Sequence, residues 1–401
     1  MILRPLYTAS GLASSVMIAA TKQHTGKTSV SMALLDGLTE MLGKGKVGYM
    51  KPIGQKYVVV GDIKVDNDVH TAKIHYKLPS DFNHMNPIVV EPGFTRKYLA
   101  GQINPDFVWE QIDEAYEVMR RQYDFLIVEG TGHTGVGSVI GASNAEVAAR
   151  LGLEIVLVAN GGVGKAIDDL NVNRVFCEAH GAHVRGIVVN KILDSKYDMV
   201  VENMKIIANK WGVQLLGAVP YGENLDRPSL MDMEDMFGSK LLAGQHCRLS
   251  KFKRFELVTT SLRSLLNRLS DPDKNFKNAC FVTHWSRNDI ILGILSHLHE
   301  ETCKRGSCGS ALLLTGKSPM NIPHETILDF IRNDNTPVML SNRPTSDTMQ
   351  MLDSIRVKMN AEDGDRTNAV VNQYKPYIDF HKFLESSASP RAVPRAVCHG
   401  T

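Results

Sequence analysis

Short apolar segments alternate with helical patterns along the first half of the chain. Residues 16–21 form the first apolar run, and Val30, Leu34, Leu38 and Leu42 then recur every four positions, as on one face of a helix. Further apolar runs, each ending in polar residues or glycine, lie at 46–52, 124–130, 154–160, 184–190 and 215–221. This alternation predicts an α/β fold with a doubly wound parallel sheet. In such a sheet, ligands bind where the carboxyl ends of the strands meet.

The pattern changes near Tyr221, where turn-forming residues precede an acidic helix that Ser229 would cap. Short apolar runs and helical patterns then alternate again as far as about residue 340. We therefore expect a first domain at 14–225 and a second, smaller α/β domain at 226–358. Residues 359–401 have little pattern and include a proline-rich near-repeat, so we expect a flexible tail there.

Composition excludes several classes of protein. The 401 residues are 43% hydrophobic and carry a net charge of +2, which is too balanced for a nucleic-acid-binding or membrane-surface protein. No apolar run approaches the roughly 18 residues of a membrane span. The six cysteines are scattered, so neither a disulfide framework nor a zinc site is expected. A reducing compartment fits, either the cytoplasm or an organelle matrix if the first residues are a targeting segment.

The first candidate site is the Gly26-Lys27-Thr28 sequence between the first predicted strand and helix. In a phosphate-binding loop, backbone N–H groups and a lysine face the anion, while a Thr or Ser hydroxyl meets Mg²⁺. The opening glycine of such loops is absent here. Its position is taken by Ala20 if the loop is one residue longer than usual, or by Thr21 if it is not. The alternative is a chance Gly-Lys-Thr at a helix start.

Three more polar residues lie at predicted strand ends. Glu129 could hold Mg²⁺ opposite Thr28, or be a solvated strand-end acid. Lys51 ends a buried strand, a place where lysine seldom serves packing. Asn190 could pair with a base through its amide, or terminate a turn. The glycines of the 129–135 segment let a substrate approach, and His133 there could carry a proton or be structural.

Five segments, in this order, resemble the dethiobiotin synthetase-like group of P-loop proteins: ATKQHTGKT, YMKPIGQ, VEGTGHTG, GIVVNK and LLGAVPY. Beyond them, VTHWSRNDIILGIL, ALLLTG and TPVMLSN resemble the DRTGG domain that follows such a domain in the N-terminal region of some phosphate acetyltransferases. The resemblance implies a parallel sheet of P-loop type and a homodimer that binds ATP and Mg²⁺. We expect no nucleic acid partner.

The resemblance also implies roles for individual residues. Ala20 falls on the opening position of the longer loop. The expected phosphate-binding residues are Ala20, Thr25, Gly26, Lys27, Thr28 and Ser29. Thr28, Glu129 and Asp68 would bind Mg²⁺, with Asp66 as the alternative to Asp68. Lys27 and Lys51 would be catalytic, and Asn190 would read the adenine base.

Two departures place the acceptor substrate in question. Gly54, Gln55 and Lys56 replace a small residue, a serine and a glycine of the synthetases, and Lys22, Gln23 and His24 replace Asp, Thr and Glu. We therefore expect an anionic acceptor that is not the diamine of the synthetases. The expected reaction is phosphorylation of a carboxylate or carbamate on this acceptor, or simple hydrolysis of ATP. The alternatives are a nucleotide sensor without turnover and an assembly scaffold. In the second domain, the strand ends at 287–289 and 316–317 could bind a phosphate or be structural.

Overall fold

The computed structural model describes residues 14–385, apart from 272, 275, 306–308, 317–324 and 334–335, and apart from the side chains of 301–305. The described residues form two compact units. Residues 14–222 and 359–385 make the first unit, and residues 223–358 make the second. The division between the units falls between Gly222 and Glu223. The sequence predicted it three residues later, between 225 and 226.

The first unit is built on a six-stranded sheet in the order β10-β9-β8-β1-β7-β2, with every neighbouring pair parallel. Its strands are β1 (Ser14–Ala20), β2 (Val47–Met50), β7 (Phe125–His133), β8 (Glu154–Asn160), β9 (Val184–Ile192) and β10 (Gln214–Pro220). The central strands are buried on both faces, as near-continuous apolar runs require. The predicted doubly wound parallel sheet is thus confirmed.

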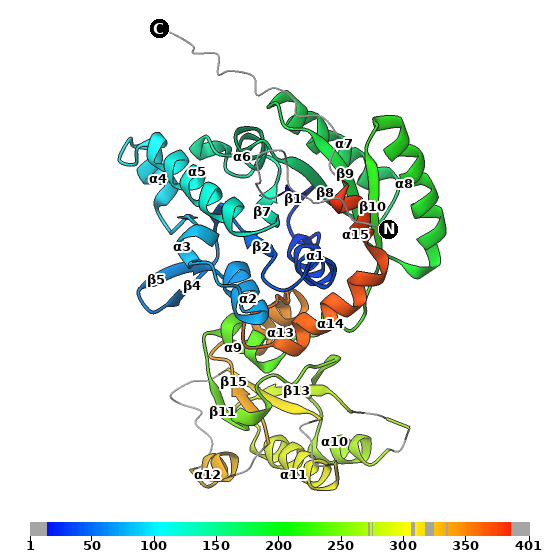
Figure 1. Cartoon of the computed structure of the whole chain (residues 1–401). Helices are drawn as coiled ribbons and strands as arrows, with labels where there is room; N and C mark the ends of the chain where they lie inside the picture. Colours follow the sequence, from blue (N-terminus) through cyan, green and yellow to red (C-terminus); the bar gives the residue numbers. More distant parts are fainter. Residues whose placement is uncertain are drawn as a thin grey trace. The chain divides into compact units, whose positions relative to one another are not determined.

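Helices connect these strands and cover the sheet (Figure 1). They are α1 (Lys27–Leu42), α2 (Asn67–Tyr76), α3 (Phe82–Met85), α4 (Phe94–Leu99), α5 (Pro105–Gln122), α6 (Asn144–Leu151), α7 (Gly164–Ala179) and α8 (Tyr197–Trp211). Their ends follow local chemistry: Asn104 caps α5 just before Pro105, and Ser143 caps α6 in a capping box. Between β2 and α5 lie the two-stranded pairings β3 (Ile53–Gly54) with β6 (Ile88–Val89), and β4 (Tyr57–Val60) with β5 (Ile63–Asp66).

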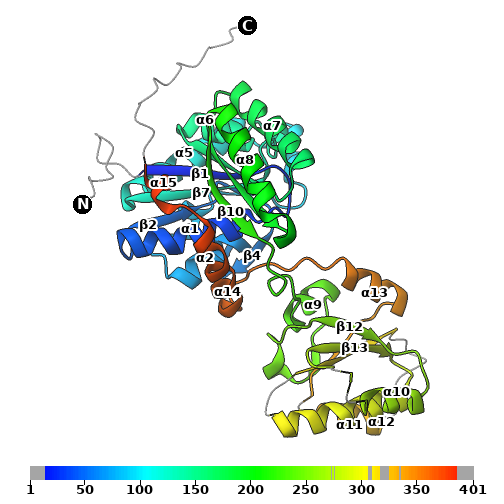
Figure 2. The same ribbon diagram turned by 90° about the vertical axis from the view of Figure 1, so that its right-hand side faces the viewer.

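The segment after the second unit returns to the first. It forms α14 (Gly364–Tyr374) and α15 (Phe380–Leu384), and Figure 2 shows both beside the elements of the first unit. Ile378 pairs with Gly217 at the β10 edge, and Asp379 N–H donates to Leu216 O at 2.9 Å. The predicted flexible tail is therefore wrong for 359–385, because these residues cover a sheet edge and pack on α1. The proline-rich repeat lies outside the described residues.

The second unit has a five-stranded sheet in the order β11-β15-β14-β13-β12. Only β11 is antiparallel to its neighbour. The strands are β11 (Leu241–Ala243), β12 (Arg254–Leu257), β13 (Ala279–His284), β14 (Ala311–Thr315) and β15 (Val338–Leu340), and the helices are α9 (Leu230–Phe237), α10 (Leu262–Leu269), α11 (Asn288–Arg305), α12 (Glu325–Asn333) and α13 (Thr345–Asp353). Ser229 caps α9 as expected. Two hydrophobic clusters form its core, so the predicted second α/β unit is present.

Two expectations from composition have different outcomes. None of the helices in the described ranges is long and apolar enough to cross a membrane. Cys247 is disulfide-bonded, whereas Cys177 and Cys280 are buried free thiols. The sequence did not predict the disulfide at Cys247, because spacing along the chain does not show which cysteines the fold brings together.

Candidate functional site

The Gly-Lys-Thr sequence lies where the resemblance placed it, at the junction of β1 and α1. The expected phosphate-binding residues occupy this junction: Ala20 ends β1, Thr25 and Gly26 precede the helix, and Lys27, Thr28 and Ser29 open it. Gly26 has a φ of 92°, and a Cβ atom there would lie 2.2 Å from Asn190 Nδ2. Glycine is therefore required at this position both for its backbone conformation and for space.

Two asparagine side chains donate hydrogen bonds to backbone carbonyls of the loop. Asn173 Nδ2 on α7 donates to Thr21 O at 3.2 Å, and Asn190 Nδ2 at the end of β9 donates to Thr25 O at 2.7 Å. Both amides are buried. Because the carbonyls are bonded inward, the loop keeps one shape without a bound ligand.

The positive charges on the loop are not equivalent. Lys22 Nζ lies 2.6 Å from Asp169 Oδ2 on α7, so its charge is largely balanced within the protein. His24 is exposed and has a φ of 62°, a conformation that few non-glycine residues adopt. Of the two basic residues expected to face the acceptor, His24 is the more exposed.

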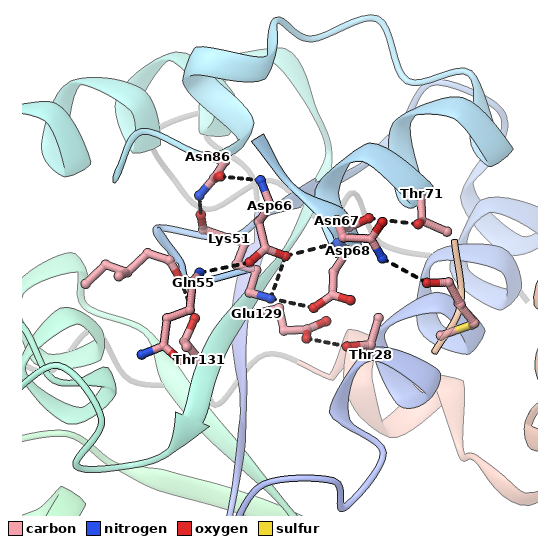
Figure 3. Close-up of polar contacts among 12 residues, drawn as sticks. Thr28, Lys51, Gln55, Asp66, Asn67, Asp68, Thr71, Asn86, Glu129 and Thr131 are labelled. Atoms are coloured by element: carbon pink, nitrogen blue, oxygen red, sulfur yellow. Dashed lines mark hydrogen bonds and ion pairs between the residues drawn. The ribbon is translucent and has the colours of Figure 1, made fainter. Parts of the chain in front are cut away.

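Thr28 and Glu129 meet at the mouth of the loop. Thr28 Oγ1 donates to Glu129 Oε1 at 2.7 Å (Figure 3). The Tyr49 hydroxyl donates to Glu129 Oε2 at 2.9 Å. Glu129 is only 1% exposed. Burial raises the pKa of Glu129 above its usual value and the charge of Asp68 adds to this, although Lys51 and the Thr28 hydroxyl oppose it. A cation beside this carboxylate would therefore relieve an unfavourable environment.

Lys51 is held between two aspartates rather than facing open solvent. Its Nζ lies 2.8 Å from Asp66 Oδ1 and is also paired with Asp68, as Figure 3 shows. Only 6% of the residue is exposed. Burial alone would lower the pKa of Lys51, but the charges of Asp68 and Asp66 outweigh it and hold the pKa well above its usual value. Lys51 is therefore a permanent cation next to Glu129.

Asp66 and Asp68 differ in their hydrogen bonds within the fold and in their exposure. Asp66 caps α2 by accepting from Asp68 N–H at 3.0 Å, and it also accepts from Gln55 N–H at 3.0 Å. Asn86 Oδ1 accepts from Asp66 N–H at 2.8 Å, and Asn86 Nδ2 donates to Lys51 O at 2.8 Å. The side chain of Asp68 is 15% exposed against 3% for Asp66. Asp68 is accordingly the more exposed of the two carboxylates, and its role as a cation ligand stays a prediction.

The side chain of Asn190 makes its hydrogen bonds within the protein. Its Nδ2 bonds both Thr25 O and, at 2.9 Å, the Tyr374 hydroxyl, while its Oδ1 accepts from Lys191 N–H at 2.8 Å. Its side chain is fully buried. The amide is thus bonded within the protein, and its reading of an adenine base stays a prediction. Sequence reasoning missed Tyr374, since nothing local marks a residue that follows the whole second unit.

The 129–135 segment is a rigid wall beside the loop. Asn144 Oδ1 accepts from Thr131 N–H at 3.0 Å, and its Nδ2 donates to Thr131 O and His133 O at 2.8 and 2.7 Å. A Cβ atom on Gly130 would lie 2.7 Å from Asn144 Oδ1, so this glycine makes room for the asparagine rather than for a ligand. His133 Nδ1 accepts from Gly135 N–H at 3.2 Å, which favours the structural interpretation of His133.

A small pocket opens on the far side of this wall. Its cavity volume is about 50 Å³, and the lining combines Ile53, Val90, Val136 and Ile140 with polar groups of Gln55, Thr95, Thr131 and Asn144. Gln55 therefore does occupy the region where the resemblance expected a smaller residue.

No group of three or more His, Cys, Asp or Glu side chains is placed to hold a metal ion anywhere in the described ranges. The expected set instead combines a hydroxyl with two carboxylates, and Thr28 and Glu129 are already in contact. In the second unit, Arg287 and Asp289 pair with each other at 3.0 Å and His284 Nδ1 contacts Ser286 Oγ at 2.7 Å. Lys317, the other residue expected there, lies outside the described residues.

The amino end of α1 has the properties of an anion site. Within the described chain, no side chain caps it and its first turn has no acidic residue. Helix-terminal N–H groups and the helix dipole favour a phosphate at such a position. An anion there would lie beside the positive charge of Lys27. The Thr28–Glu129 pair next to it could hold a cation that a phosphate group would bind as well.

The chain is similar to several known proteins. The ATP-dependent dethiobiotin synthetase BioD of Methanocaldococcus jannaschii is 27% identical over 219 residues, covering 53% of this chain and 96% of that protein. A phosphate acetyltransferase of Nitratidesulfovibrio vulgaris is 21% identical over 394 residues, covering 96% of this chain and 53% of that protein. The chain thus spans about half the length of that acetyltransferase. The solved MinC:MinD cell division protein complex of Aquifex aeolicus matches 53% of this chain and 83% of that chain at 14% identity, with a TM-score of 0.34.

The chain is thus similar to a dethiobiotin synthetase over its first half and to a phosphate acetyltransferase over nearly all of its length, while the DRTGG-like character of the second unit stays a prediction. Residues 14–229, more than half of the chain, match the AAA_26 family, whose description is "AAA domain". With its phosphate loop at the β1–α1 junction and its parallel sheet, the chain belongs to this AAA domain family and has a P-loop, ATP-binding fold.

Proposed function

We propose that the protein binds ATP with Mg²⁺ and transfers the γ-phosphoryl group to a carboxylate or carbamate, or to water. The contact between Thr28 Oγ1 and Glu129 Oε1, 2.7 Å long at the mouth of the loop, carries the proposal. In P-loop enzymes a hydroxyl from the loop and an acid from a neighbouring strand end hold the cation of the nucleotide. The similarity to ATP-dependent dethiobiotin synthetases supports the same assignment.

The residues present fit a magnesium nucleotide. The uncapped start of α1 and the backbone of Gly26 suit the phosphates, and buried Glu129 suits a cation. Thr28, Glu129 and Asp68 would hold Mg²⁺, which would supply positive charge beside the phosphates. Lys27 and the loop N–H groups would stabilise negative charge on the transferring oxygens.

Lys51 would act at the acceptor side. Because it is buried and paired with Asp66 and Asp68, it keeps its charge and its place without a ligand. A fixed cation of this kind steadies an anionic acceptor better than a mobile one does. When Asp68 turns to the metal, one of the two bonds to Lys51 becomes available for the acceptor.

We propose that the acceptor is an anion and not the diamine of a dethiobiotin synthetase. Gln55 lines the pocket beside the wall, and His24 presents a basic ring where the synthetases have an acid. Lys22 contributes less than expected, since Asp169 balances it. Supplied with 7,8-diaminopelargonate, bicarbonate, ATP and Mg²⁺, the protein should form no cyclic urea detectable by mass spectrometry above a heat-treated control. Robust turnover would refute this choice of acceptor.

A second function, nucleotide sensing without turnover, has one specific observation in its favour. Asp66 and Asp68 both pair with Lys51, so its positive charge is balanced within the protein and less of it would act on an acceptor. The similarity to half of a phosphate acetyltransferase is compatible with a regulatory role as well. In either case we propose a homodimer, as in the synthetases, which sedimentation equilibrium would test.

Phosphate release from ATP by the purified full chain separates these functions. Steady release that requires Mg²⁺ and is lost in Glu129→Gln marks an enzyme, since the variant keeps the size of the side chain and removes its charge. ATP binding without release marks a sensor. Absence of ATP binding would overturn the whole proposal.

A further inference from the structure

The C-terminal segment reaches the phosphate loop through the hydroxyl group of Tyr374. Tyr374, the last residue of α14, is 4% exposed and its hydroxyl accepts from Asn190 Nδ2 at 2.9 Å. The same Nδ2 donates to Thr25 O at 2.7 Å, directly before Gly26. A Cβ atom on Gly26 would lie 3.3 Å from the Tyr374 hydroxyl. Three segments far apart in the sequence therefore meet under the loop.

We propose that residues 359–385 complete the nucleotide site, with Tyr374 as a positioning residue that fixes the phosphate loop through Asn190. This inference rests on the proposed ATP binding. An amide nitrogen has two N–H groups, and here one is used by the loop and the other by the tyrosine. With both used, the amide plane is fixed, and so is the Thr25 carbonyl that it holds.

The segment is fastened on each side of Tyr374, which makes it a rigid support. Lys375 Nζ lies 2.7 Å from Asp36 Oδ2 and 2.6 Å from Glu40 Oε1, both on α1. At the start of the segment, Asn67 Nδ2 donates to Met359 O at 2.9 Å, next to Asp68. A side chain placed by several contacts holds its partner better than one on a mobile tail.

The first turn of α14 adds a buried ion pair. Asp363 caps the helix by accepting from Arg366 N–H at 3.0 Å, and its carboxylate lies 3.0 Å from Arg366 Nε. The two side chains are only 2% and 3% exposed. Buried charges persist only when paired, so this pair ties the beginning of α14 to one geometry.

Loss of the tyrosine hydroxyl would loosen the loop rather than the fold. Asn190 would then be free to turn its amide, and the loop would spend part of its time in shapes that do not bind phosphate. Apparent affinity falls in proportion to the competent fraction. One lost hydrogen bond of this kind corresponds to about a tenfold loss.

The test compares Tyr374→Phe with Tyr377→Phe in the full-length protein. Tyr377 lies three residues further along, is 39% exposed and contacts the ring of Tyr197 instead of the loop. Tyr374→Phe should weaken ATP binding by about tenfold and speed hydrogen exchange of the 21–28 amides. Tyr377→Phe should do neither, and both variants should unfold at nearly the wild-type urea concentration.

A double mutant distinguishes positioning from general damage. Asn190→Ala cuts the same link from the other end, so Tyr374→Phe should have no further effect on ATP affinity in that background. Additive effects, or wild-type affinity and wild-type loop exchange in Tyr374→Phe, would overturn the inference. If the Phe variant does not fold, Asn190→Ala alone must show the affinity loss. A wild type that binds no ATP refutes the proposed function instead, while the exchange experiment still decides whether Tyr374 holds the loop.

Discussion

Lys51 carries its charge inside the protein, and this changes what a substitution there would do. Its two carboxylate partners, Asp66 and Asp68, are themselves largely buried. Without the lysine, two negative groups would face each other with little water between them. Breaking a buried pair by removing one partner costs about 3–5 kcal/mol, far more than the pair contributes relative to an apolar replacement.

We therefore expect Lys51→Met to lower the free energy of unfolding by about 3 kcal/mol or more, even without any ligand. Lys64→Met is the matched control. Lys64 also forms an ion pair, with Glu91 at 2.6 Å, but both side chains are more than 40% exposed. Exposed pairs contribute about 0–1 kcal/mol, so this variant should be close to wild type. Urea unfolding measures both, and equal stabilities of the two variants would show that the Lys51 cluster is open to water.

Residues with local sequence signals were the predictable ones. Gly26, Lys27 and Thr28 could be placed because strand, loop and helix patterns surround them. Glu129 could be named because the apolar pattern predicts a strand that ends there, although β7 in fact continues to His133. Asp66 and Asp68 could be named as candidate Mg²⁺ ligands, but not as the two carboxylates that pair with buried Lys51. The link from Asn190 to Tyr374 was out of reach, because no pattern relates two residues that are 184 positions apart.

Helices α14 and α15 show how an element can be missed when its sequence pattern is weak. They are short, and their stability comes from docking rather than from propensity. The docking surface includes Gly37 in the middle of α1. A Cβ atom there would lie 2.4 Å from the ring of Phe380, so the absent side chain leaves the space that the ring fills.

Gly37→Ala should consequently destabilise the protein, although alanine is the better helix former. The helix gains about 1 kcal/mol in propensity, but displacing a packed ring costs about 1–3 kcal/mol. Gly164→Ala, at the start of α7, meets nothing within 4 Å and should be neutral or slightly stabilising. Proteolysis near residue 380 should be faster in Gly37→Ala alone. Wild-type stability and protease resistance in that variant would mean that α15 does not pack on α1.

At the scale of the whole molecule, the second unit is an insertion between β10 and α14. Its chain leaves the first unit after Gly222 and returns at Met359. The sequence predicted an α/β arrangement for both units because strand and helix patterns alternate in each. It did not predict the return, since a linear reading assigns whatever follows the last regular element to a tail.

This topology makes a specific prediction for a single cut between the units. Cleavage at 223–228 should leave two fragments that elute together on size exclusion, because 359–385 stays docked on the first unit. Urea should separate them. If residues 359–385 were a flexible tail, the two fragments would elute separately without urea. That result would contradict the fold described here.

ATP binding by the wild type and by Lys27→Ala, measured by calorimetry with and without Mg²⁺, tests the central claim most directly. Lys27 is half-buried at the start of α1, and its loss removes charge beside the phosphates without opening a core cavity. We predict Mg²⁺-dependent binding to the wild type, nearly complete loss of binding in the variant, and similar melting temperatures for the two proteins without nucleotide. Equal ATP binding by both proteins would contradict the assignment of the phosphate loop and, with it, the account of the site.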